Sequence, residues 1–143
     1  MDRREMLGSV GALAMAALAV DAVGADHDHH HHGGKYQGLI GTSGDCVRTG
    51  EACLNHCFDL LAKGDKQMAA CAKSVNELLA VCAALQRLAT SESKFLTKYA
   101  KVAGEICEDC EKECRKHQKK HSQCKDCADA CAACLKECRK IAV

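Results

Sequence analysis

Apolar and polar side chains recur at intervals of three and four along residues 45–143, and this spacing predicts α-helices. A helix turns about 100° per residue, so positions three and four apart lie on nearly the same face. The pattern is interrupted where Gly64 suits a helix C-terminal stop and where Asp65, Ser91 and Ser122 suit helix N-caps. We therefore expect four helices, at about 45–62, 65–88, 91–117 and 122–140.

The joints between these helices are short, and this determines how the helices pack. Helices joined by a few residues lie antiparallel to their neighbours in sequence. The predicted fold class is therefore all-α, an antiparallel up-down four-helix bundle over residues 45–143 with cysteines lining its core. The same topology places the joint after Lys63 and the joint after His117 at one end of the bundle.

Cysteine occupies the positions where a bundle helix ordinarily carries leucine. The segment CKDCADACAACLKECRK, residues 124–140, holds five cysteines within an arc of about 80° on a helix. The cysteines of the other three helices lie within arcs of about 20° to 60°. Each helix is therefore predicted to turn a stripe of thiols towards the bundle interior. The thirteen candidate metal ligands are Cys46, Cys53, Cys57, Cys71, Cys82, Cys107, Cys110, Cys114, Cys124, Cys127, Cys131, Cys134 and Cys138.

Two of these stripes resemble each other in sequence. The segment CEDCEKECRK, residues 107–116, begins Cys-X-Asp-Cys and ends Lys-Glu-Cys-Arg-Lys. The segment at residues 124–140 begins and ends in the same way. Duplication of one Cys-lined helix explains this similarity.

Three roles compete for the thiols: disulfides, small core side chains and metal ligands. Disulfides would be favoured in an oxidising compartment outside the cytoplasm. However, thirteen cysteines is an odd number, so at least one thiol would remain unpaired. Facing helices also lie about 8–10 Å apart, whereas a disulfide needs Cα atoms within about 7 Å. Leucine or valine would bury more apolar area than cysteine, at about 25 cal/mol per Å². Metal ligation is therefore the favoured role.

The predicted metal is Cu(I), with several ions bound per chain. Thiolates suit Cu(I), Zn(II) and iron–sulfur clusters, and the proline-terminated cluster motif is absent from a chain without proline. Zinc held by about four thiolates leaves a net charge of −2 at each site, which a buried core with several sites would tolerate poorly. One Cu(I) per thiolate leaves the whole array neutral.

Composition narrows the remaining classes of function. The 143 residues form one domain by length, and a formal net charge of +1 gives no electrostatic reason to bind nucleic acid. No Ser/His/Asp set, carboxylate pair or glycine-rich phosphate loop is recognisable, so we expect no enzyme. Three alternatives remain: a protein that sequesters zinc or heavy metals, a copper chaperone, and a thiol redox protein. The number of ions bound per chain would distinguish them from a copper store.

The N-terminal residues resemble a targeting segment. Arg3 and Arg4 precede a modestly apolar run rich in Ala and Gly, and Val23 and Ala25 suit a small-residue cleavage site. We expect a twin-arginine (Tat) signal peptide over residues 1–25, export to the periplasm or another extracytoplasmic compartment, and no membrane attachment after cleavage. The alternative is a membrane anchor, although the run of roughly 15 apolar residues is short for a span of about 20.

A His- and Gly-rich segment, residues 26–44, follows the predicted cleavage site. Its glycines predict a loose linker with at most a short helix at its end. Histidines 27 and 29–32 offer ligands to a borderline metal ion, either as a defined site or as a weak, non-specific collector.

The Cys-lined helices, the export signal and the stretch GEACLNHCFDLLAKGDKQMAAC, residues 50–71, resemble the exported bacterial copper storage proteins. The resemblance extends from about residue 35 to the C-terminus. It implies a four-helix bundle that stores many Cu(I) ions, assembled as a homotetramer. It also implies that His56 and Met68 lie where copper enters, although two further sulfur-bearing positions of that family's mouth are Leu60 and Lys63 here.

The predicted topology brings His117 and His121 to the same end as His56 and Met68. We therefore add His117 to the candidate entrance residues. The alternative is that His117 and His121 are ordinary exposed residues at helix ends.

Replacement of Arg3 and Arg4 by lysine should retain the precursor in the cytoplasm, because the Tat pathway reads the arginine pair. Cell fractionation and immunoblotting would measure this, with the unmodified chain as the control. Unchanged export of the double variant would contradict the assignment.

Overall fold

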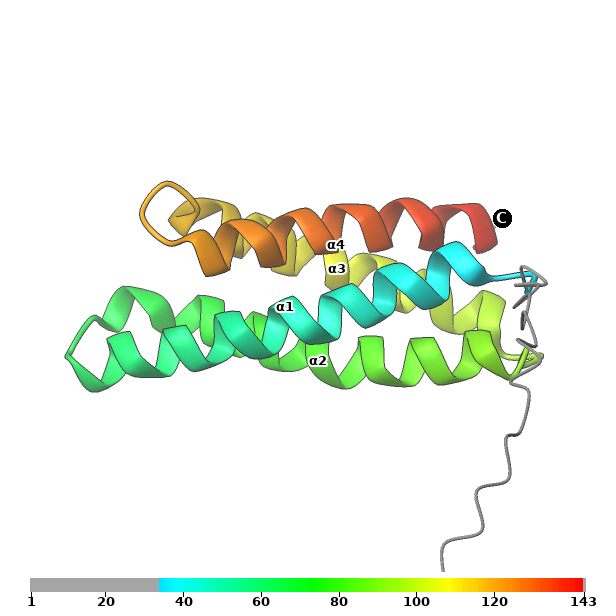
Figure 1. Ribbon diagram of the computed structural model, residues 1–143, viewed down its shortest axis with the longest axis horizontal. Coiled ribbons are helices and arrows are strands. Elements are labelled where there is room, and N and C mark those ends of the chain that lie inside the picture. The colour runs from blue at the N-terminus through cyan, green and yellow to red at the C-terminus, as the bar shows by residue number, and fades with distance from the viewer. Residues whose placement is uncertain (1–33, 143) are drawn as a thin grey trace, which may run out of the picture. The chain divides into compact units, whose positions relative to one another are not determined.

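Residues 34–142 form a bundle of four α-helices in a computed structural model (Figure 1). The structure does not describe residues 1–33 and 143, so the predicted signal peptide and the histidines at 27–32 lie outside it. The helices are α1 Gln37–Ala62, α2 Ala69–Thr90, α3 Leu96–His117 and α4 Ser122–Ile141, with a short 3₁₀ helix η1, Lys66–Met68, before α2.

Each helix packs against its neighbours in sequence, and α1 packs against α4 to close the bundle. Within residues 34–142 the diagonal pairs, α1 with α3 and α2 with α4, make no comparable contact. Figure 1 shows the chain reversing direction at each joint. This confirms the predicted all-α, up-down four-helix bundle.

Helix α1 begins at Gln37, eight residues before the predicted start at Asp45. The three glycines at 38, 41 and 44 argued for a linker, because glycine weakens a helix by about 1 kcal/mol relative to alanine. Tertiary packing outweighs this preference, since Leu39 is only 1% exposed and the Ser43 hydroxyl, also buried, donates to the Leu39 carbonyl at 2.7 Å.

The helix ends agree only partly with the predicted caps. Asp65 accepts a hydrogen bond from the Gln67 backbone N–H at 3.1 Å, as expected of a cap, although this opens η1 and α2 itself begins at Ala69. Ser91 does not cap α3. It is the C-cap of α2, and the next residue, Glu92, has a left-handed φ of 48°. The hydroxyl oxygen of Ser93, rather than that of Ser91, accepts a hydrogen bond from the Phe95 N–H before α3.

Ser122 is likewise not the N-cap of α4. His121 holds that position with extended backbone, and Ser122 is the first residue of the helix. The Ser122 hydroxyl donates to the side chain of Gln123 at 3.3 Å, so it leaves the backbone N–H groups of the first turn without a side-chain cap.

Two glycines meet specific needs of the backbone. Gly64 has a φ of 91° in the joint after α1, where a side chain would be strained. Gly50 lets α1 approach α2 closely, because a Cβ atom there would lie 2.9 Å from Leu79 Cδ2 and 3.6 Å from Val75 Cγ1. The α1–α2 pair is therefore tightly packed halfway along the bundle.

The two ends of the bundle differ in character. At the end where α1 begins and the α2–α3 joint lies, the core is aliphatic; we call this the leucine end. Its buried side chains, each 1% exposed or less, are Leu39, Leu85, Ala89, Leu96 and Ala100. At the opposite end the α1–α2 and α3–α4 joints bring His56 and His121 together, and we call this the histidine end.

Residues Lys66–Thr90, which include α2, are long and apolar enough to cross a membrane by length and composition alone. In the bundle, α2 instead contributes buried side chains to the core, among them Val75, Leu78 and Leu85. Packing within the bundle buries 39% of this apolar window.

The reduced, metal-free protein should already be mostly helical, because the helices bury leucine, alanine and protonated cysteine without any ion. Far-UV circular dichroism of the apo-protein under reducing conditions would measure this, with the Cu(I)-loaded protein as the comparison. A coil spectrum that becomes helical only on adding Cu(I) would show that folding depends on metal.

Candidate metal centre

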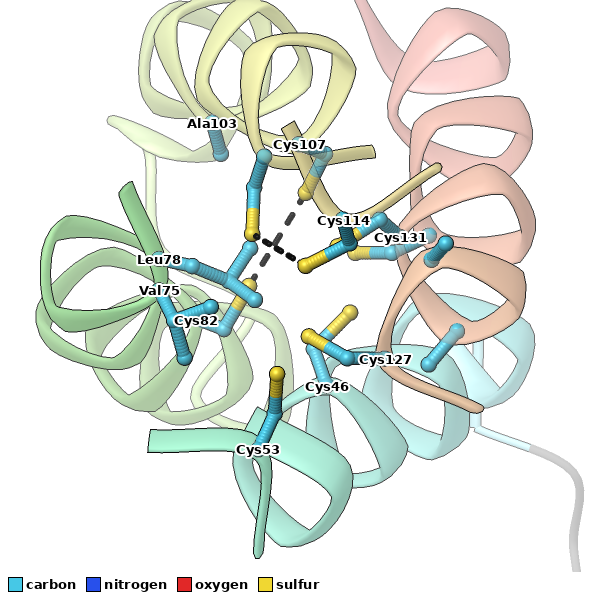
Figure 2. Close-up of a cluster of buried hydrophobic side chains, with 14 of the residues drawn as sticks. Cys46, Cys53, Val75, Leu78, Cys82, Ala103, Cys107, Cys114, Cys127 and Cys131 are labelled. Carbon is cyan, nitrogen blue, oxygen red and sulfur yellow. Dashed lines mark hydrogen bonds between the residues drawn. The ribbon is translucent and has the colours of Figure 1, made fainter. Parts of the chain in front are cut away.

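All thirteen cysteines lie in the bundle core. Their side chains are 0% exposed, apart from Cys138 at 1%. Figure 2 shows sulfur atoms from different helices pointing into one interior space, among them those of Cys46, Cys53 and Cys107. The prediction that each stripe faces inward is confirmed.

The core thiols are free rather than joined in disulfides. Sulfur atoms approach to 3.6 Å between Cys71 and Cys114 and to 3.8 Å between Cys53 and Cys124. These distances are nearly twice the disulfide bond length of about 2.05 Å. They instead leave room for a metal ion to bridge two sulfurs.

The sulfur atoms gather into groups of metal-binding size. Within each group every Sγ atom lies within 4.8 Å of every other. One group takes one thiol from each of the four helices, and the others draw on two or three helices. The groups are Cys46–Cys82–Cys107–Cys134, Cys53–Cys57–Cys71–Cys124, Cys53–Cys114–Cys127 and Cys110–Cys127–Cys131.

No cationic side chain is buried beside these thiols in the described part of the chain. The buried polar side chains there are those of Ser43 and Thr49. Their hydroxyls donate to carbonyls of α1, at 2.7 Å to Leu39 and 2.8 Å to Asp45. A thiolate in this core would therefore gain no charge partner from the protein.

Hydrogen bonds between thiols, together with burial, determine where the protons stay. Cys114 and other neighbours raise the pKa of Cys53 above its ordinary value of 9.0. Cys127 accepts hydrogen bonds from Cys110 and further thiols, and this lowers its pKa. Thiols whose pKa is raised outnumber those whose pKa is lowered. The raised ones are Cys46, Cys53, Cys82, Cys107, Cys114, Cys131 and Cys138.

The metal-free core is therefore mostly protonated at neutral pH. A soft metal ion that binds there replaces the protons of its ligands, because the thiolate is the ligand. A monovalent ion that replaces one proton leaves the charge of the core unchanged.

At the histidine end, His56 directly precedes Cys57 on α1, and His121 lies three residues before Cys124 at the start of α4. His56 Nε2 lies 2.9 Å from His121 Nδ1, and the ring centroids are 4.8 Å apart. Burial, followed by the nearby His56 and His117, lowers the pKa of His121. A pair of imidazoles thus lies next to the first thiols of the core.

The other predicted entrance residues lie at this same end. Met68 is buried, 1% exposed, at the end of η1, and His117 is half-buried at the end of α3. Sequence reasoning named His121 only as a possible rim residue. His121 contacts His56, which is 65 residues away in the sequence. This contact depends on how the α1–α2 and α3–α4 joints pack together, and a local sequence pattern does not predict that packing.

The free energy of unfolding of the reduced apo-protein should fall as the pH rises above about 9.0. Thiols with raised pKa stay protonated in the bundle but ionise in the unfolded chain, so the stability that they contribute below pH 9.0 is lost above it. The slope is about 1.4 kcal/mol per pH unit for each thiol that ionises only on unfolding. Anaerobic urea denaturation between about pH 7.5 and 10 would measure it; constant stability over that range would contradict the protonated core.

Comparisons with known proteins agree with this geometry. The copper storage protein family matches residues 31–143. The uncharacterized cysteine-rich protein YhjQ of Bacillus subtilis (strain 168) is 32% identical over 99 residues, which cover 68% of this chain and 89% of that protein.

Two solved structures share the fold. Apo-Csp3, copper storage protein 3 from Bacillus subtilis, is 28% identical with a TM-score of 0.66, and the match covers 75% of this chain and 98% of that one. The Cu(I)-bound copper storage protein BsCsp3 is 27% identical with a TM-score of 0.65, covering 73% and 95%. The Cys-lined four-helix bundle described above therefore belongs to the copper storage protein family.

Proposed function

We propose that this protein stores Cu(I) inside the bundle and that its capacity approaches one ion per cysteine. The observation that carries the proposal is the set of thirteen buried, free thiols with no cationic partner. Membership of the copper storage protein family and the Cu(I) bound in the BsCsp3 structure support the choice of metal.

Charge and coordination number favour Cu(I) over Zn(II). Cu(I) accepts two or three thiolates, and the groups of three and four sulfurs supply such sites. Zinc in an all-thiolate site keeps a net charge of −2, and no buried cation balances it in the described core. Several such sites along one core would repel one another.

Burial of the thiols favours storage over catalysis. A redox cysteine acts as an accessible thiolate of low pKa, whereas Cys71, whose pKa is lowered to about 4 chiefly by Cys114, is 0% exposed. A chaperone that hands over one ion needs two or three accessible ligands. The core offers many more, and it encloses them.

The histidine end is the proposed entrance for copper. His56 and His121 form a polar contact beside Cys57 and Cys124, and Met68 adds a buried thioether. Thioether and neutral imidazole both bind Cu(I). Within residues 34–142, the core at the leucine end is closed by aliphatic side chains rather than by metal ligands.

We further propose that the chain is exported by the Tat pathway to the periplasm or another extracytoplasmic compartment, and that it forms a homotetramer. The arginine pair at residues 3 and 4 supports export. The chain belongs to the copper storage protein family, and the homotetramer is the assembly that this resemblance implies.

Anaerobic titration of the reduced mature protein with Cu(I), against a competing chelator, should saturate near one ion per cysteine, close to thirteen ions per chain. Zn(II) at about four thiolates per ion should fill at most about three sites and should be lost to a zinc chelator. A thiol assay before titration fixes the number of reduced cysteines.

Two outcomes would contradict the storage proposal. Saturation of the fully reduced protein at one or two Cu(I) ions would favour a chaperone or redox role. Zn(II) uptake that equals that of Cu(I) and resists a chelator would refute the argument from charge neutrality.

A further inference from the structure

Eleven of the thirteen thiols fall into two sets rather than one continuous array, and Cys131 and Cys138 lie outside both. Three of the four sulfur groups are linked through shared members, Cys53 and Cys127, whereas the group Cys46–Cys82–Cys107–Cys134 shares none. We call this group the inner tetrad. The linked groups, without Cys131, form the outer set, which lies towards the histidine end: Cys53, Cys57, Cys71, Cys110, Cys114, Cys124 and Cys127.

Close sulfur contacts keep to the same division. Cys82 and Cys107 approach to 3.9 Å within the inner tetrad. In the outer set, Cys110 and Cys114 approach to 4.0 Å. The contacts Cys71–Cys114 and Cys53–Cys124 also lie within the outer set.

The α1–α2 half of the core contains no sulfur between the two sets. On α2, Val75 and Leu78, both 0% exposed, occupy the inward positions between Cys71 and Cys82. Those two cysteines are eleven residues apart, which is about 16 Å along a helix. On α1 the corresponding inward position is Gly50, where Leu79 and Val75 fill the space.

Cys131 on α4 spans the division. It forms a group with Cys110 and Cys127 of the outer set. Cys134 of the inner tetrad follows it by three residues, one turn further along α4. Hydrogen bonds with Cys110, Cys127 and Cys46 together raise the pKa of Cys131. The interaction with Cys46 acts reciprocally on that thiol. Cys131 therefore faces both sets.

Ions have no comparable path into the inner tetrad from the leucine end, where the core is aliphatic. A surface hollow of about 150 Å³ lies beside Cys138, over Gly104 and Leu135. The Cys138 thiol at its floor is 1% exposed and interacts with Cys134 of the tetrad. This hollow is the competing route that an experiment must distinguish.

We propose that Cys131 is the relay through which Cu(I) passes from the outer set to the inner tetrad, so that the outer set fills first. The proposal rests on storage of Cu(I) and on its entrance at the histidine end. It assigns to Cys131 a role in transfer beyond that of one more ligand.

The transfer is a ligand exchange without redox change. A Cu–S bond to Cys127 breaks as a bond to Cys131 forms, and the ion then moves from Cys131 to Cys46. Each thiol that gains the ion gives its proton to the thiolate that loses it. Copper remains Cu(I), and the net charge of the core stays constant.

The test compares Cys131→Ala with Cys110→Ala. Each variant loses one thiol from the same group of three, but Cys110→Ala leaves Cys127 to connect the outer set to Cys131. Reduced apo-protein is mixed anaerobically with excess Cu(I)–bicinchoninate, and the fall in absorbance of that complex follows uptake. Circular dichroism and a thermal melt confirm folding, and Cys131→Ser, which replaces the thiol with a hydroxyl in the same position, repeats the measurement.

Cys110→Ala should take up about twelve ions with the wild-type time course. Cys131→Ala should take up about seven ions rapidly, the capacity of the outer set, and the remainder at least roughly tenfold more slowly. Refolding the urea-unfolded variant in the presence of Cu(I) should restore about twelve ions, because the core then loads before it closes.

Uptake by Cys131→Ala as fast and complete as that by Cys110→Ala would overturn the relay and point to entry beside Cys138. A lasting deficit after refolding would also overturn it, because Cys131 would then be needed to hold ions in the tetrad. If the wild-type protein itself bound only one or two ions, storage would fail and the relay with it. The wild-type capacity thus separates failure of storage from failure of the relay alone.

Discussion

The absence of a positive charge beside the buried thiols is the constraint on which the rest of the structure depends. Thirteen sulfur atoms lie in a core whose buried polar side chains, within residues 34–142, are two hydroxyls satisfied by the helix backbone. Such a core must remain close to neutral, because an unpaired buried charge is costly. Protons neutralise most of its thiols before loading, and monovalent copper neutralises the thiolates afterwards. The identity of the metal follows from this electrostatic condition as well as from the softness of sulfur.

Neutral thiols also allow the bundle to fold before it is loaded. A protonated cysteine packs as a small apolar side chain, but it buries less area than leucine, so the thiol-lined length of the core contributes less to stability. The aliphatic leucine end and the close α1–α2 contact at Gly50 supply packing that the thiols do not. Stability and metal capacity are thus placed in different parts of one small domain.

Much of this arrangement is readable from sequence, because helix periodicity and burial are local properties. The four helices and the inward direction of all thirteen cysteines were predicted and are confirmed by the structure. The start of α1 was wrong, because local glycine content says nothing of how Leu39 packs. The caps at Ser91 and Ser122 were wrong because the left-handed backbone of Glu92 and the extended backbone of His121 set those helix ends. The contact between His56 and His121 depends on two joints meeting, and the sequence pattern could place them only at one end.

The division of the thiols into two sets follows from the unequal contributions of the two halves of the bundle. Helices α3 and α4 carry the repeated Cys-X-Asp-Cys segments and place a thiol on each inward turn from Cys107 to Cys114 and from Cys124 to Cys138. Helices α1 and α2 interrupt their stripes at Gly50 and at Val75 and Leu78, where they pack on each other. A core built equally from four thiol stripes would have no preferred internal route. Here the close packing of α1 on α2 leaves no sulfur on one side of the core, so continuity between the two sets lies along α3 and α4, where we place the relay at Cys131.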